Sequence, residues 1–382
     1  FKPLIVLLLF TIVFIITVDY VKNRRPLGFP PGPWALPIVG NIFSLAEKYG
    51  NVYSLRIGQK WTVVLNGFEV LKGALVTQGD SLADRPLTPL SVDRSQGLGL
   101  ILTSGHIWRQ QRRFALSPLR YFGFGKKSLE PVILDEFTHC AEEFRSYKGT
   151  SKPFNPRLTT MNVTANIICS LVFGRRFEYS DEKFRKGLCF SNEEIITSVI
   201  ASICSSLQLY NAFPVLMRYF PGLQQKLQKN WAGVKGLIRE EINEHKQISS
   251  EQRRDYIDCY LNEIQMNKGK DDNTFDEENL INCVWDLFVA GSETTSTTLR
   301  WAFLYMVKYP EIQEKVQAEI DGVIGQSRHP SMEDRANLPY TDAVLHEIQR
   351  MGNIVPLSVP HFTNRDVHIH SLGSFGNIVW LF

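Results

Sequence analysis

Apolar residues recur at helical spacing through most of this chain, and the longest such segment runs from about Phe275 to Lys308. Shorter alternating stretches over residues 51–58 and 61–67 predict a small β-hairpin, and no repeat of fixed period is present. The sequence therefore predicts a mainly α fold with a minor β-sheet. The other helical segments, separated by turn clusters, are expected near 128–147, 157–173, 191–208, 223–247, 253–266, 310–324 and 340–351.

The middle of the 275–308 segment breaks the rules of a helix interior. Residues 290–298 read Ala-Gly-Ser-Glu-Thr-Thr-Ser-Thr-Thr, although β-branched threonine is a poor helix residue and Gly costs about 1 kcal/mol relative to Ala. Gly291 would let a flat group approach the backbone, and Thr294 would bond back to the carbonyl of Ala290 and open a groove for water or a small ligand. Glu293 beside it could feed protons. The alternative is a solvated, threonine-rich turn on a surface helix.

Two further motifs place polar or charged side chains about one helical turn apart. Trp108 and Arg112 present an indole donor and a guanidinium on one helix face, which suits the binding of a carboxylate. An ordinary basic helix face is the alternative. Glu347 and Arg350 lie three residues apart in a predicted helix, so they face each other and can pair. Surface pairs of this kind are common and contribute little by themselves.

The N-terminal residues have the pattern of a membrane anchor. Residues 3–18 carry no charge, and a helix continued to Val21, at about 1.5 Å per residue, just spans a hydrocarbon core of about 30 Å. A signal peptide is the alternative, but no small-residue cleavage site is visible. Residues 22–41 combine a basic stop, which would hold the remainder in the cytosol, with a stiff proline-rich hinge. Because the first residue is Phe1 and not Met, we expect the N-terminus to be processed or incomplete.

The composition excludes several classes of protein. Of the 382 residues, 44% are hydrophobic and 21% charged, so the chain can fill a sizeable core. The mean hydropathy of −0.12 excludes a polytopic membrane protein. With 42 basic and 39 acidic residues, the net charge of +3 gives no reason to expect a nucleic-acid partner. The six cysteines lie far apart without a CxxC motif, which indicates reduced thiols and not a disulfide or zinc scaffold.

Taken together and in order, these motifs resemble one family, the cytochrome P-450 haem-thiolate monooxygenases. Residues 122–128, 209–214 and 309–317 look like its microsomal family 2, and in particular the J-like branch that epoxidises fatty acids and oxidises drugs. The resemblance runs from the anchor to about residue 370. It implies the cytochrome P-450 fold, haem b as cofactor, and insertion of one oxygen atom of O2 into a lipophilic fatty acid, drug or other xenobiotic.

The resemblance also implies which residues contact the cofactor. Trp108 and Arg112 would hold one haem propionate, and His361 would contact another. Ala290 and Gly291 would lie against the haem on the distal helix. Each of these positions matches the family motif, and none follows from spacing alone.

Roles in catalysis, structure and substrate binding are implied in the same way. Glu293 and Thr294 would deliver the protons that allow one oxygen atom to leave as water, and Glu347 and Arg350 would form a buried structural pair on the haem side. The implied substrate contacts are apolar, as expected for a lipophilic substrate. They come from three segments and include Leu98, Gly99, Leu100, Ile101, Phe288, Ala290, Ile354, Val355, Leu357 and Val359.

The implied partners and location follow the family. NADPH cytochrome P-450 reductase would supply electrons, cytochrome b5 is a second candidate partner, and no nucleic acid is expected. The N-terminal anchor would hold the body on the cytosolic side of the endoplasmic-reticulum membrane, in contact with lipid.

Two stretches depart from the family. Only residues 42–47 remain where the family has a longer stretch that includes much of its first helix, and residues 371–382 resemble nothing in the family. No cysteine follows Cys283, although the family binds iron through a cysteine in a loop beyond the Glu-x-x-Arg motif. Cys283 lies about three turns before Thr294 on the distal helix, so it cannot replace that ligand.

We therefore expect a partial cytochrome P-450 domain over residues 42–370, truncated before its axial ligand and inactive as it stands. The alternative is a non-catalytic, membrane-anchored variant that competes with full-length enzyme for reductase or for membrane sites.

Overall fold

The computed structural model describes residue 17 and residues 49–57, 60–147, 154–203, 205–248, 253–355, 358–368, 374–375 and 379–381. The expected anchor over residues 1–21 and the hinge over residues 22–41 lie outside these ranges, apart from Thr17. Among the helices of the described ranges, none combines the length and the apolar character that a membrane span requires.

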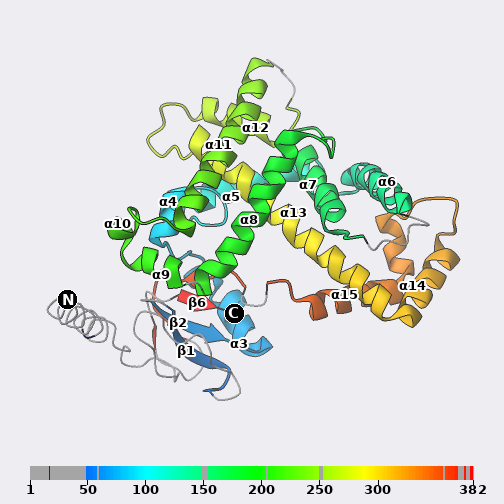
Figure 1. The fold of residues 1–382 in the computed structure, drawn as a ribbon, viewed down its shortest axis with the longest axis horizontal. Coiled ribbons are helices and arrows are strands. Elements are labelled where there is room, and N and C mark those ends of the chain that lie inside the picture. Colours follow the sequence, from blue (N-terminus) through cyan, green and yellow to red (C-terminus); the bar gives the residue numbers. More distant parts are fainter. Residues whose placement is uncertain are drawn as a thin grey trace, which may run out of the picture.

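Helices make up most of the described chain, as predicted (Figure 1). Short turns of other helix types occur at Gly73–Thr77, Gly79–Leu82, Lys127–Leu129 and Met332–Asn337. The α-helices are α3 Phe68–Lys72, α4 Pro89–Ser95, α5 Gly105–Tyr121, α6 Glu130–Ser146, α7 Arg157–Val172, α8 Glu182–Ile203, α9 Ser205–Ala212, α10 Pro214–Met217, α11 Leu223–Gln247, α12 Tyr256–Met266, α13 Glu277–Lys308, α14 Pro310–Val323 and α15 Pro339–Gly352.

The predicted segment 223–247 coincides with α11, and the segment predicted from about 275 to 308 matches α13. Helix α8 begins at Glu182, well before the predicted start near 191, because Asp181 caps it by accepting a hydrogen bond from the backbone N–H of Phe184 at 3.0 Å. Phe184 and Leu188, both buried, lie on one face of this additional N-terminal segment of the helix. Asp181 is therefore a sequence signal for the start of this helix, and a prediction from apolar periodicity alone does not include it.

The predicted hairpin is present and is part of a larger sheet. Strands β1 (Val52–Ile57) and β2 (Lys60–Leu65) pair antiparallel, and β6 (Val379–Leu381) lies parallel to β2. Strand β3 (His361–Phe362) completes the order β1-β2-β6-β3. A second, two-stranded sheet pairs β4 (Val367–His368) with β5 (Ser374–Phe375). The segment that follows residue 370 therefore contributes strands to both sheets.

Helix α13 crosses the middle of the molecule, with α11 and α12 toward one end and α14 and α15 at the other (Figure 1). Residues 279–286 in its N-terminal half are all buried, and Leu280, Ile281, Cys283 and Val284 have no exposed surface. Helix α7 packs along it, and Thr164 donates a hydrogen bond to the carbonyl of Ser292 at 2.9 Å. The alternative of a solvated surface helix is therefore wrong, because the threonine-rich middle of α13 faces a packed neighbour on one side.

Candidate active site

Ala290 and Thr294 lie one turn apart on an open face in the middle of α13. Ala290 is exposed and Thr294 half-buried, whereas residues 279–286 earlier in the helix are all buried. The Thr294 hydroxyl donates to the Ala290 carbonyl at 2.6 Å, as the sequence predicted. Thr298 repeats this contact one turn later, donating to the Thr294 carbonyl at 3.0 Å. The helix nevertheless continues without interruption, so these threonines provide hydroxyl groups on an open face and not a break in the helix.

Gly291 has a packing role that the sequence analysis did not anticipate. A Cβ atom at this position would lie 2.4 Å from Cδ1 of Ile168 on α7. The missing side chain therefore allows α7 to approach α13 closely, which is a different use from the expected approach of a flat cofactor. Helix α7 and a cofactor would approach Gly291 from different sides of the α13 backbone.

Glu293 precedes Thr294 on α13 and is 8% exposed. Its Oε1 is 3.6 Å from the Arg300 guanidinium, and its buried Oε2 has no hydrogen-bond partner among the described residues. Burial lowers the pKa of Arg300, although the charge of Glu293 opposes this effect. Glu293 and Thr294 are thus neighbours in sequence with different surroundings, one buried beside a cation and one on the open face.

Four side chains from distant parts of the chain form a basic cluster. The Arg112 guanidinium lies 5.5 Å from the centre of the Trp108 ring on α5. Arg85 donates to the Pro360 carbonyl at 3.2 Å, and the Nδ1 of the adjacent His361 contacts the Leu82 carbonyl at 2.5 Å. We call Arg85, Trp108, Arg112 and His361 the basic cluster.

The basic cluster is electrostatically unbalanced. Burial and the charge of Arg112 lower the pKa of Arg85. Burial and the charge of Arg85 lower the pKa of His361, against the opposing effect of its bond to Leu82. Within the described ranges, neither arginine has a carboxylate partner. Like charges held together in this way fit a ligand with two carboxylates, such as the propionates of haem.

Arg85 is the member of the basic cluster that the sequence analysis missed. It lies far from Trp108 and His361 in sequence and reaches them because residue 84 forms a bridge with Phe362. No local spacing could have revealed this, because the contact depends on the pairing of segments about 280 residues apart in the chain.

The implied substrate contacts do not all share one surface, and Phe288 is a correction. A separation of two residues turns a helix by about 200°, so Phe288 and Ala290 cannot lie on the same face. Phe288 is 6% exposed and packs with α7, α8 and α11, away from the open face. Leu98, Ile101 and Ile354 are half-buried, while Val355 and Val359 are exposed. Leu357 lies outside the described ranges.

A buried carboxylate fixes the loop that contains Leu98 and Ile101. Asp286 on α13 accepts hydrogen bonds at Oδ2 from the backbone N–H groups of Leu100, at 2.7 Å, and Ile101, at 2.9 Å. Its Oδ1 lies 3.6 Å from the Arg94 guanidinium. Burial raises the pKa of Asp286, although Arg94 and both amides oppose this effect. Gly99 has φ +92°, and a Cβ there would lie 2.5 Å from Oδ2, so only glycine permits this approach.

The Glu347–Arg350 pair forms as predicted, but it is not buried. Arg350 donates to both carboxylate oxygens of Glu347, at 2.7 and 2.5 Å, within α15. The two side chains are 57% and 66% exposed. The implied buried pair is therefore a correction, because no described residue covers this face of α15.

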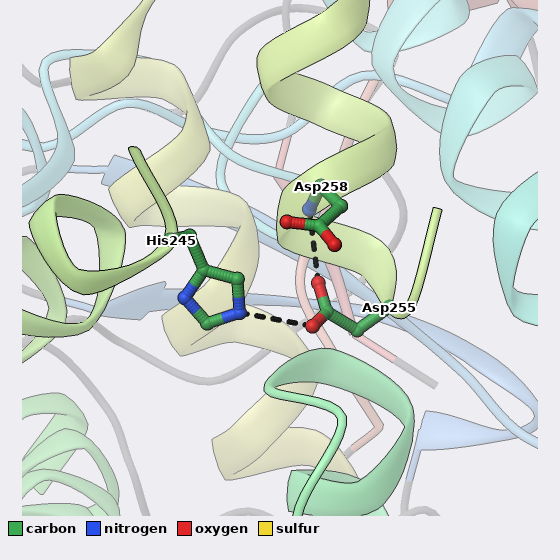
Figure 2. Close-up of side chains that lie close together, drawn as sticks. All are labelled: His245, Asp255 and Asp258. Atoms are coloured by element: carbon green, nitrogen blue, oxygen red, sulfur yellow. Dashed lines mark hydrogen bonds and ion pairs between the residues drawn. The ribbon is translucent and has the colours of Figure 1, made fainter. Parts of the chain in front are cut away.

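A second cluster, of His245, Asp255 and Asp258, has the residue types of a metal site (Figure 2). The Nδ1 of His245 lies 2.7 Å from the Glu241 carbonyl, and its Nε2 lies 2.9 Å from Oδ2 of Asp255. Asp255 Oδ1 caps α12 by accepting from the backbone N–H of Asp258, whose carboxylate binds Arg254. Because both ring nitrogens face oxygen acceptors, the imidazole can donate to both only in its protonated form, which has no lone pair for a metal.

His245 therefore makes an ion pair that joins the end of α11 to the start of α12, and its stability should depend on pH. Burial lowers the pKa of His245, but Asp255 and the Glu241 carbonyl outweigh this and raise it above the ordinary value. A raised folded-state pKa stabilises the protein fully below the unfolded value of about 6.5 and ceases to do so as pH rises through the folded value.

We expect His245→Gln to lower the free energy of unfolding by about 2 kcal/mol at pH 6, a value typical of a partly buried imidazolium at a helix C-terminus. The difference from wild type should shrink as pH approaches 9. Urea unfolding across this range measures it. His346→Gln is the control, because His346 also contacts a carbonyl one turn earlier but is 65% exposed. A pH-independent difference would mean that His245 is neutral.

Comparison with known proteins identifies the family. The cytochrome P450 family model matches residues 30–372. Cytochrome P450 2J2 of Homo sapiens is 46% identical over 367 residues, which cover 93% of this chain and 72% of the relative. Cytochrome P450 2J5 of Mus musculus is 44% identical over 366 residues, covering 92% and 72%. Cytochrome P450 2C44 of Mus musculus is 41% identical over 360 residues, covering 91% and 72%. The chain therefore belongs to the cytochrome P450 family of haem monooxygenases, and within it to the J-like part of microsomal family 2.

Proposed function

We propose that this protein inserts one oxygen atom of O2 into lipophilic substrates, of which polyunsaturated fatty acids and apolar xenobiotics are the expected classes. The observation that carries this proposal is the open face of α13 at Ala290 and Thr294, where a hydroxyl lies just beyond the buried part of the helix over residues 279–286. The basic cluster supports it, since its cations suit the two carboxylates of haem.

Haem, when bound, would supply the iron at which dioxygen is activated. The residues of this chain would then have three tasks. Arg85 and Arg112 would neutralise the propionates, with Trp108 as an additional indole donor and His361 in contact with one of them. Thr294 would hold a proton at Oγ1, in the hydrogen bond that this hydroxyl donates to the Ala290 carbonyl.

Glu293 would act as the buried proton reservoir behind Thr294, because its Oε2 has no hydrogen-bond partner among the described residues and its Oε1 faces Arg300. The loop around Leu98 and Ile101, fixed by Asp286, would orient the apolar substrate. These roles need side chains held in place before substrate binds, as the contacts of Asp286 provide.

We further propose electron supply from NADPH through cytochrome P-450 reductase, with cytochrome b5 as a second electron donor. The apolar residues 3–18 and the basic residues that follow support an endoplasmic-reticulum anchor with the body in the cytosol.

Thr294→Ala tests the proposed chemistry in a form of the protein that carries the family's cysteine loop. We expect haem to be retained and the ratio of product to consumed O2 to fall about tenfold, because proton delivery is impaired. Thr294→Ser should restore the ratio. Thr298→Ala is the control, since it removes the same type of back-bonded hydroxyl one turn away. An unchanged ratio in Thr294→Ala, or an equal fall in the control, would contradict the role of Thr294.

A further inference from the structure

A small cavity lies on the side of α13 opposite the open face. It has a volume of about 60 Å³, is partly open to solvent, and is lined by side chains of α7, α8, α11 and α13. Aromatic rings form much of its wall, with Phe177 stacked on Phe184 at 5.6 Å and Trp285 stacked on Phe288 at 5.8 Å. We call this the aromatic cavity. Stacked rings are rigid, so the space between them is not readily closed by side-chain rotation.

The polar groups at the edge of the aromatic cavity are already engaged. Both carboxylate oxygens of Glu241 accept hydrogen bonds from Arg175, at 2.7 and 2.8 Å. The Lys183 ammonium lies 3.0 Å from a carboxylate oxygen of Glu240. A buried water needs two to four polar partners, and these walls do not offer them. The cavity therefore favours an apolar occupant over water.

The volume limits how large such an occupant can be. An engineered apolar cavity of about 150 Å³ holds benzene or xenon, and the aromatic cavity is less than half as large. We propose that the aromatic cavity is a binding site for small apolar molecules of the size of xenon and dioxygen. The site lies apart from the face proposed for catalysis, and its occupancy does not depend on haem.

Gly187 on α8 allows the site to be filled by mutation. It lines the cavity, and a Cβ there would meet only Cζ of Phe288, at 3.9 Å, which is ordinary van der Waals contact. Gly187→Leu should therefore place a side chain in the cavity. Gly236→Leu on α11 is the matched control, because Gly236 is exposed and nothing lies within 4 Å of its added Cβ.

The test is a titration of the 382-residue chain with xenon, followed by the chemical shift of dissolved ¹²⁹Xe. We expect saturable binding in the unaltered chain and in Gly236→Leu, and at least fivefold weaker binding in Gly187→Leu. Absence of saturable binding, or equal binding in Gly187→Leu with a native circular-dichroism spectrum, would overturn the proposal.

Dioxygen provides a second measurement that needs no variant and decides the matter if Gly187→Leu does not fold. Dioxygen is paramagnetic and relaxes nearby methyl protons. We expect stronger relaxation for Val234 and Val284, which line the cavity, than for Val63, which is equally buried in the core beside the sheet. Equal relaxation at the three valines would overturn the proposal.

Discussion

A polypeptide consisting of residues 1–382, reconstituted with haem, reduced and exposed to carbon monoxide, is expected to show none of the red-shifted difference band that a thiolate ligand produces. No turnover should follow addition of reductase. The reason is chemical: the band and the cleavage of the O–O bond both require a cysteine thiolate on the iron, and these residues contain no cysteine after Cys283.

The buried cysteines Cys169, Cys259 and Cys283 are poorly suited to replace that ligand. Cys283 is buried on α13, with its sulfur 3.6 Å from Gln111, and burial raises its pKa well above the usual range. Burial likewise raises the pKa of Cys169, and it raises that of Cys259 to about 11. A neutral, buried thiol is a weak metal ligand. Absorbance difference spectroscopy gives the answer directly, and a thiolate band from this polypeptide would mean that one of its own cysteines reaches the iron.

The long helices could be predicted because their signals are local. Helix α13 begins where Asp276 caps it, accepting a hydrogen bond from the backbone N–H of Asn279 at 2.7 Å, and the helix then continues for 32 residues with apolar runs on both sides of its threonine-rich middle. The back-bond of Thr294 is equally local, since donor and acceptor are one turn apart. The Glu347–Arg350 pair could be predicted for the same reason, whereas its exposure depends on what packs over α15.

The site could be predicted only in part, because much of it depends on contacts between distant segments. Arg85 joins the basic cluster through strand pairing near His361, which no spacing reveals. Phe288 was placed on the wrong face, although its separation of two residues from Ala290 could have excluded it. Asp286 had a usable signal: it is a single carboxylate within the apolar run Val-Trp-Asp-Leu-Phe-Val, and a buried charge requires partners.

Asp286→Ala is expected to lower the free energy of unfolding by about 3–5 kcal/mol, the range for breaking a buried ion pair by removing one partner. The carboxylate is 4% exposed, and the Arg94 guanidinium that faces it is 21% exposed. Its removal leaves this cation without the carboxylate and also removes the acceptor of the Leu100 and Ile101 amides. Urea unfolding monitored by circular dichroism measures the loss, and limited proteolysis should show cleavage near residues 98–101.

Two variants separate the effect of removing the carboxylate that faces Arg94 from the other effects of Asp286→Ala. Asp276→Ala removes an aspartate that caps the same helix without facing a cation, and should lower the free energy of unfolding by only about 1 kcal/mol. Adding Arg94→Met to Asp286→Ala should recover part of the loss, because the uncompensated cation is then gone and its aliphatic volume is kept. If Asp286→Ala lowers stability no more than Asp276→Ala, or if Arg94→Met makes the double variant less stable still, the carboxylate does not serve to balance Arg94. The loop at Leu98 and Ile101 would then be held to α13 by its apolar contacts alone.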